Sequence, residues 1–163
     1  MNGREDDYTF SDSYVDNSQV IVVAEDSGID TLDALAGKVV GVQAASAALE
    51  LLQSEEEGGQ KALADTFGSL NEFADYNTAF TELQAGALDA LAIDIGVAKY
   101  QIKSRGDGYK IVDETLNTEQ YAVAFKKGNQ ELCDKINADL QKLTDDGTVA
   151  ELAEKYEIAI WSH

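Results

Sequence analysis

The chain has 163 residues, with 31 acidic and 12 basic side chains and a formal net charge of −19. An apolar content of 44% and a charged content of 26% are typical of a globular domain and argue against a disordered or fibrous protein. The negative charge argues against nucleic acid or an anionic membrane surface as a partner. With one cysteine, Cys133, and one histidine, the terminal His163, we expect no disulfide, no metal site, no cofactor and no histidine-based catalysis.

Strands and helices alternate through the first two thirds of the chain. A β-branched run at residues 19–24 is typical of a buried strand, and Thr31 and Gly37 are the expected N-cap and terminating glycine of a short helix between them. We then expect strand 38–42, helix 48–52, strand 70–74, helix 77–84, strand 87–93 and helix 95–103. This alternation predicts an α/β fold with a mostly parallel sheet and helices on both faces.

The pattern changes after residue 103. Thr148 and Glu151 have the spacing of a capping box and predict the start of a last helix. The complete set of later elements is strand 109–112, strand 121–125, a long helix with Leu132, Ile136, Leu140 and Leu143 on one face, and a helix from Thr148 to about Tyr156. No run of apolar residues approaches the roughly 20 that a membrane-spanning helix needs, and the first residues do not have the pattern of a signal peptide.

Three positions are candidates for ligand contacts. Ser46, between a predicted strand and helix, is either an ordinary N-cap or a donor at a helix start that favours anions. Asp94, after an apolar strand, either caps the next helix or binds a cation. Arg4 is either a solvated charge or a two-pronged ligand for a carboxylate. Because a free amino acid carries both charges, Arg4 and Asp94 together predict an amino-acid clamp.

Several segments in a fixed order give the chain a more specific resemblance. They are Arg4 followed by Phe10-Ser11-Asp12-Ser13-Tyr14, the segment 32–42, the segment 83–90 followed by Asp94, the segment 121–128, and the tail 143–148 followed by Lys155-Tyr156. With them the chain resembles the type II periplasmic solute-binding proteins of ABC importers, in the branch that binds polar amino acids. The family usually has Pro at the position of Ser13.

The resemblance implies a two-lobed protein of which this chain is a fragment. Residues 1–19 would be a remnant of lobe 1 with the first hinge crossing, residues 20–125 lobe 2, and residues 126–163 the C-terminal helices returning to lobe 1. A complete family member has a further stretch of lobe 1 ahead of Arg4. Without that stretch, apolar faces of lobe 1 would be exposed, and we expect self-association of the chain.

The resemblance also implies roles for individual residues. Arg4 would bind the ligand α-carboxylate and Asp94 its α-ammonium. Ser46 and the backbones of Ala45 and Ala47 would donate to the carboxylate, although the family usually has Gly and then Ser or Thr in this loop. The other expected positions are Gln43 and Ile93 toward the ligand side chain, and Tyr76 and Asn77 on the hinge side.

The implied function is the capture of a free, polar L-amino acid between two lobes and its delivery to the membrane permease of an ABC importer, outside the cytoplasm. No bond is made or broken, so we expect no enzyme. One alternative is a dehydratase-type enzyme on the same scaffold, with Glu119 as the candidate acid. Others are a ligand-sensing module of a receptor and a flavodoxin-like or response-regulator domain, which would need an acidic cluster beyond Glu25 and Asp26. Glutamine, histidine, basic amino acids and cystine all remain open as ligands.

Overall fold

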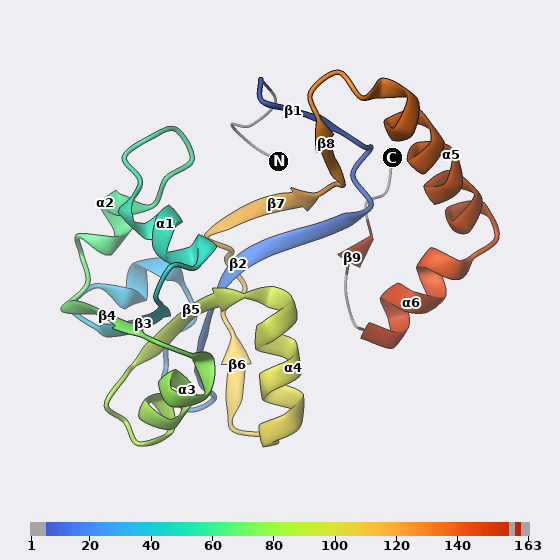
Figure 1. Ribbon diagram of the computed structural model, residues 1–163. Coiled ribbons are helices and arrows are strands. Elements are labelled where there is room, and N and C mark those ends of the chain that lie inside the picture. Colours follow the sequence, from blue (N-terminus) through green and yellow to red (C-terminus); the bar gives the residue numbers. More distant parts are fainter. Residues whose placement is uncertain (1–5, 157–158, 161–163) are drawn as a thin grey trace. The chain divides into compact units, whose positions relative to one another are not determined.

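Two units make up the part of the chain described by the computed structural model, residues 6–156 and 159–160. Unit 2 comprises Ser18–Asn117, and unit 1 combines the described residues of Met1–Asn17 and Thr118–His163. Strand β2 (Val15–Ala24) and strand β7 (Asn117–Tyr121) pair with each other, and each has residues in both units (Figure 1). The predicted lobe 2, residues 20–125, shares residues 20–117 with unit 2.

The sheet of unit 2 has the strand order β4–β3–β5–β2–β6. Its strands besides β2 are β3 (Val39–Gln43), β4 (Ser69–Phe73), β5 (Ala90–Asp94) and β6 (Tyr109–Ile111). β3 pairs in parallel with β4 and with β5, whereas β2 pairs antiparallel with β5 and with β6. The α/β class is confirmed, but the sheet is mixed and not mostly parallel.

The direction of β2 explains this difference. Only a short 3-10 helix, η1 (Leu32–Leu35), lies between β2 and β3, so the connection lacks the long crossover helix that usually joins parallel strands. The alternation of strands and helices in the sequence does not fix the direction of such a strand. Thr31 is the N-cap of η1, but its side chain makes no capping hydrogen bond, contrary to the prediction.

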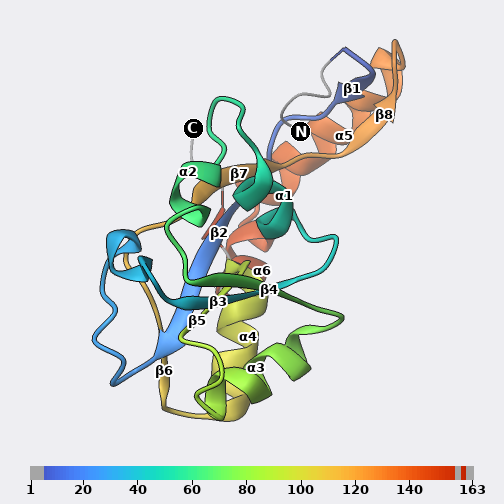
Figure 2. The ribbon, with the colours of Figure 1, turned by 90° about the vertical axis from the view of Figure 1, so that its left-hand side faces the viewer.

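Helices cover both faces of this sheet, as predicted. One hydrophobic cluster joins η1, α1 (Ala47–Gln53) and α2 (Lys61–Ala64) to one face, and a second joins α3 (Tyr76–Gln84) and α4 (Ile95–Arg105) to the other. Figure 2 shows these two groups of helices on opposite sides of the strands. Side chains alternate along β2 accordingly. Ile21 and Val23 pack with α1, and Val20 and Val22 belong to the cluster of α3 and α4.

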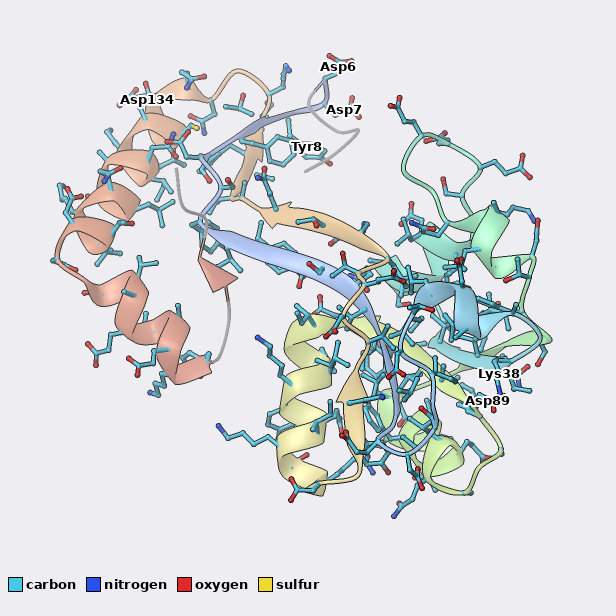
Figure 3. All side chains as sticks on the ribbon, turned by 180° about the vertical axis from the view of Figure 1, so that it is seen from behind. Asp6, Asp7, Tyr8, Lys38, Asp89 and Asp134 are labelled. Atoms are coloured by element: carbon cyan, nitrogen blue, oxygen red, sulfur yellow. The ribbon has the colours of Figure 1, made fainter. Side chains whose placement is uncertain are left out.

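An aspartate holds the amino ends of β3 and β5 together. Asp89 precedes β5, and its Oδ2 accepts a hydrogen bond from the backbone N–H of Val39 at 2.8 Å. The Lys38 ammonium lies 3.8 Å from Asp89 Oδ1, and Figure 3 shows the two side chains next to each other. Because both side chains are substantially exposed, the backbone hydrogen bond contributes more than this ion pair. The strand pair is thereby fixed in register at the end away from Asp94.

Unit 1 contains a small antiparallel strand pair and two helices. β1 (Tyr8–Phe10) pairs with β8 (Ala124–Lys126), and the helices are α5 (Gln130–Asp145) and α6 (Thr148–Tyr156). β9 (Ala159–Ile160) pairs antiparallel with the start of β2. The single strand predicted at 121–125 is wrong, because β7 ends at Tyr121 and β8 begins at Ala124.

The start of α6 differs from the predicted capping box. Thr148 is the first residue of the helix, and its backbone N–H donates to Asp146 Oδ1 at 2.9 Å. Hydrogen bonds from the side chain and backbone of Thr148 lower the pKa of Asp146. Asp146, the C-cap of α5, therefore accepts the first N–H group of α6, and Thr148 is the first helical residue and not the N-cap that a capping box requires.

The apolar side chains of unit 1 are unevenly covered. Cys133 on α5 is buried, as expected for a small thiol, and its Sγ donates to the carbonyl oxygen of Phe10 at 3.1 Å. Large apolar side chains of the same unit are exposed, namely Tyr8, Tyr121, Leu132, Leu143, Leu152 and Tyr156. Self-association through such surfaces stays a prediction.

Candidate ligand-binding site

Three parallel strands of unit 2 end at one edge of the sheet, and each is followed by a helix. β3 leads to α1, β4 to α3 and β5 to α4. β3 and β5 are neighbours, yet α1 packs on one face of the sheet and α4 on the other. This arrangement is a topological switch point, the place where open α/β sheets bind ligands. The candidate site therefore lies at the carboxyl ends of β3 and β5.

Acidic and hydroxyl side chains cap the three helices that start at this edge. Ser46 Oγ accepts the N–H of Leu49 at 3.2 Å, and Asp75 Oδ1 accepts the N–H of Thr78 at 2.9 Å. Asp94 Oδ1 accepts the N–H groups of Gly96 at 2.9 Å and Val97 at 3.4 Å. The capping interpretation of Ser46 and Asp94 is thus confirmed. It does not exclude ligand contact, because an ionised carboxylate has two oxygens with about four acceptor positions.

Tyr76 connects Ser46 and Asp94. It is the first residue of α3 and is partly buried. Burial is the main cause that raises its pKa, and the nearby charge of Asp94 raises it further. The nearby Ser46 hydroxyl acts in the opposite direction and lowers this pKa. The phenol therefore stays protonated at neutral pH, and the polar side chains of three separate strand–helix loops converge here.

The loop after β3 is held in an unusual backbone conformation. Gln43 Nε2 donates to the carbonyl oxygen of Ala74 at 3.2 Å, which ties this loop to the loop after β4. Ala45 has a φ of 56°, the one positive value at a non-glycine residue in the described part of the chain. Ala45 and Ala47 are both exposed, and Ala47 begins α1, where backbone N–H groups lack acceptors within the helix.

A family comparison identifies the scaffold on which this site lies. The family model of the bacterial extracellular solute-binding proteins, family 3, matches residues 2–158. The chain belongs to this family. Among curated members, it is 29% identical over 155 residues to the ABC transporter glutamine-binding protein GlnH of Bacillus subtilis (strain 168). It is 34% identical over 156 residues to the arginine-binding extracellular protein ArtP of the same organism.

Length separates the chain from these family 3 proteins. The two alignments cover 94% of this chain but only 53% of GlnH and 58% of ArtP, so the chain spans about half the length of these relatives. Solved structures likewise match nearly all of this chain but only part of their own length. A substrate-binding protein of an ABC uptake transporter from Streptococcus pneumoniae with bound histidine has a TM-score of 0.78 and 30% identity over 96% of this chain and 63% of its own. An ancestral arginine-binding protein bound to arginine has a TM-score of 0.72 and 38% identity over 96% and 67%.

Ala45 lies in a loop where the resemblance to the family implies a glycine. The left-handed φ of 56° supplies the physical reason for a glycine, because a Cβ is strained in that region. This chain therefore has a methyl group at a backbone position that favours glycine.

Two predicted site residues of this family 3 chain have a different role in the structure. Ile93 has no exposed surface and packs in the hydrophobic cluster of α3 and α4, so its side chain contributes to the core and has no surface for a ligand. The physical reason is the alternation along β5, which directs Ile93 and Asp94 to opposite faces. Asn77 Oδ1 accepts from Arg105 Nη2 at 3.0 Å and from Gln101 Nε2 at 3.4 Å, which ties α3 to α4.

The remaining charged candidates are Arg4 and Glu119. Arg4 lies outside the described residues. Glu119 is part of a hydrogen-bond network within unit 1, in which the buried Asn17 donates through Nδ2 to Glu119 Oε2 at 3.3 Å and to the Tyr121 hydroxyl at 3.0 Å. This network ties β2 to β7.

Gln19 is a polar residue near the site that the sequence analysis did not single out. It lies on β2 directly opposite Asp94, and its side chain is 2% exposed. A glutamine at the start of an otherwise apolar, β-branched run was the available signal.

Residues 6–156 and 159–160 contain no cluster of three or more His, Cys, Asp or Glu side chains arranged to hold a metal ion. In the same ranges, no helix combines the length and the apolar character that a membrane span requires.

Proposed function

We propose that this chain supplies one part of an amino-acid binding site in the substrate-binding component of an ABC importer. The family assignment supports a solute-binding role. The observation that carries the proposal is the convergence of Ser46, Tyr76 and Asp94 at the switch point between β3 and β5. The ligand class we propose is a free, polar L-amino acid.

The chemistry of these side chains fits a zwitterion. Asp94 is the anion for the α-ammonium group of the ligand. The hydroxyl of Ser46 and the N–H groups of Ala45 and Ala47 at the start of α1 are donors for its α-carboxylate. In this proposal the Tyr76 hydroxyl, which lies near Ser46, helps to hold the serine side chain in place. Gln43, the last residue of β3, would face the ligand side chain.

A carboxylate also needs a compensating positive charge, because the protein has a net charge of −19. We assign this role to Arg4, whose planar guanidinium donates two parallel hydrogen bonds to a carboxylate. A ligand that joins charges from different parts of the polypeptide stabilises the closed conformation of a two-lobed protein. We further propose that this conformation is recognised by a membrane permease outside the cytoplasm, in line with the description of the family as extracellular.

The names of similar proteins support the ligand class. They include a glutamine-binding protein, an arginine-binding protein and an L-cystine-binding protein. All three ligands are α-amino acids, and they share only the α-carboxylate and α-ammonium groups that the proposed site recognises. We therefore assign recognition of these shared groups to the residues named above. Selectivity among amino-acid side chains is assigned to other contacts.

Titration followed by NMR tests this proposal on the chain itself. L-glutamine, L-arginine, L-histidine, L-cystine and L-glutamate are added separately, and the backbone amide resonances are recorded. We expect at least one amino acid to shift the resonances of residues 44–47, 75–78 and 94–97. The matched controls are the amine without the α-carboxylate and the acid without the α-ammonium, which should bind more weakly. The proposed function would be contradicted if no amino acid shifted the resonances of these loops. It would also be contradicted if both controls shifted them as much as the amino acid does.

A further inference from the structure

We propose that Gln19 is a positioning residue for Asp94, and that its side-chain amide donates a hydrogen bond to the Asp94 carboxylate and orients it for the ligand. The effect of this hydrogen bond on ligand binding rests on the function proposed above. The hydrogen bond itself is a property of the chain without ligand, so it can be tested independently.

The strand register places the two side chains next to each other. Gln19 and Asp94 are directly opposite in the antiparallel pairing of β2 with β5. Ile21 and Val23 of β2, and Ala90 and Ala92 of β5, belong to the cluster on the α1 face. Because side chains alternate along a strand, Gln19 and Asp94 both lie on that same face. Directly opposite residues on one face have Cβ atoms about 5 Å apart, within reach of a glutamine side chain.

The side-chain amide of Gln19 is buried and therefore needs a hydrogen-bond partner within the protein. The residue is only 2% exposed, and its backbone is fully engaged: its N–H donates to Asn117 Oδ1 at 3.2 Å and its carbonyl oxygen accepts from Leu116 at 2.8 Å. Within the described ranges the side-chain amide has no hydrogen-bond partner in its present rotamer, Asp94 included, so the proposed bond requires a turn of the glutamine side chain. Buried amides in folded proteins nearly always have a partner. An acceptor is therefore expected on this face, and the carboxylate directly across the strand pair supplies one.

The hydrogen bonds of Asp94 explain what the amide would add. The start of α4 holds Asp94 Oδ1 from one side, through the N–H groups of Gly96 and Val97. An amide donor from β2 approaches the carboxylate from the neighbouring strand. Together the two sets of donors fix the carboxylate between β2 and α4. A ligand ammonium then meets an acceptor that is already oriented, which reduces the ordering cost of binding.

The hydrogen bond can be detected without any ligand. NMR spectra of the chain and of Asp94→Asn compare the side-chain NH₂ resonances of Gln19, with those of Gln60 as an internal reference. Gln60 is a suitable reference because its Nε2 donates to the Leu116 carbonyl oxygen at 2.7 Å, near the backbone of Gln19. We expect the Gln19 resonances to move and the Gln60 resonances to stay. Unchanged Gln19 resonances would overturn the proposal, and this arm needs no variant of Gln19.

A double-mutant cycle then tests the role in binding. Gln19→Met removes the amide at similar length, and Gln60→Met is the matched control for a lost structural amide. We expect Gln19→Met to weaken amino-acid binding about fivefold in the parent chain but not in Asp94→Asn. It should leave unchanged the affinity for the analogue that lacks the ammonium group. Equal losses in both backgrounds, or for both ligands, would overturn a positioning role.

The two arms separate the two proposals. If no amino acid binds the parent chain but the Gln19 resonances respond to Asp94→Asn, the proposed function fails and the pairing of Gln19 with Asp94 stands. If an amino acid binds and the Gln19 resonances do not respond, the positioning role fails and the proposed function stands.

Discussion

Tyr76 and Ser46 lie close together, so that the Ser46 hydroxyl acts to lower the pKa of the Tyr76 phenol, although the two residues follow different strands and stand at the start of helices on opposite faces of the sheet. This contact brings the start of α1 to the start of α3. A hydrogen bond from Gln43 Nε2 to the Ala74 carbonyl oxygen at 3.2 Å joins the end of β3 to the loop after β4. The edge of the sheet at the candidate site is thereby cross-connected before any ligand is present.

Removal of the Tyr76 hydroxyl should weaken this connection. Tyr76→Phe keeps the ring in its apolar surroundings and removes the polar contact with Ser46, so we expect the free energy of unfolding to fall by up to about 1 kcal/mol. Urea denaturation measures the change. Tyr100→Phe is the control, because Tyr100 is 70% exposed and its hydroxyl can remain hydrated. Equal stabilities of the two variants would argue against a significant Tyr76–Ser46 interaction.

Asp94→Asn separates capping from charge. Asparagine is as good an N-cap as aspartate, so the stability of α4 should change little. The ligand ammonium would lose its counter-charge, and an unpaired buried charge costs on the order of 2 to 5 kcal/mol, so affinity should fall at least about tenfold. Calorimetry with an amino acid identified by the NMR screen measures this loss.

The control for that variant is Asp75→Asn, which makes the same exchange at the N-cap of α3. Asp75 has no ligand role in the proposed site. The Asp75→Asn variant should therefore bind the amino acid with the affinity of the parent chain. A similar loss in both variants would show that general helix disturbance, and not the charge of Asp94, governs binding.

Ala45→Gly should stabilise the chain. The left-handed φ of 56° costs a residue with a Cβ about 1 to 2 kcal/mol. Glycine removes this strain but gains freedom in the unfolded state, so we expect a net increase of about 0.5 kcal/mol in the free energy of unfolding. Thermal or urea denaturation detects it. Ala44→Gly, at an exposed neighbour without this backbone conformation, should give no increase. A decrease with Ala45→Gly would show that its methyl group makes compensating contacts.

Asp75 should make stability depend on pH in the acid range. Hydrogen bonds from the backbone and side chain of Thr78 lower its pKa in the folded chain below the ordinary value of 3.8. The unfolded state therefore binds the proton more tightly, and this contribution is present above pH 3.8 and is lost as the pH falls through the lower folded pKa. Melting temperatures between pH 6 and pH 2.5 should fall less for Asp75→Asn than for the parent chain. Parallel curves would contradict the prediction.

Local patterns in the sequence were sufficient for most elements of unit 2. The β-branched run ending at Ala24, the cap residues Ser46 and Asp94, and the helix-ending Gly37, with its φ of 73°, depend only on residues close to them in sequence. The alternation of strands and helices also predicted helices on both faces. Side-chain alternation would further have separated Ile93 from Asp94, since neighbouring strand residues point to opposite faces. That error was thus avoidable from sequence.

In unit 2 the amino-acid sequence by itself determined where most strands end and helices begin, because caps, glycines and hydrophobic periodicity are local. It therefore placed Ser46 and Asp94 at strand ends. Only the tertiary structure decided that β2 runs antiparallel to β5, and hence that Gln19 lies opposite Asp94. It also brought Tyr76 to Ser46. These contacts join residues distant in sequence, and they depend on how strands pair and helices pack, which no local pattern encodes.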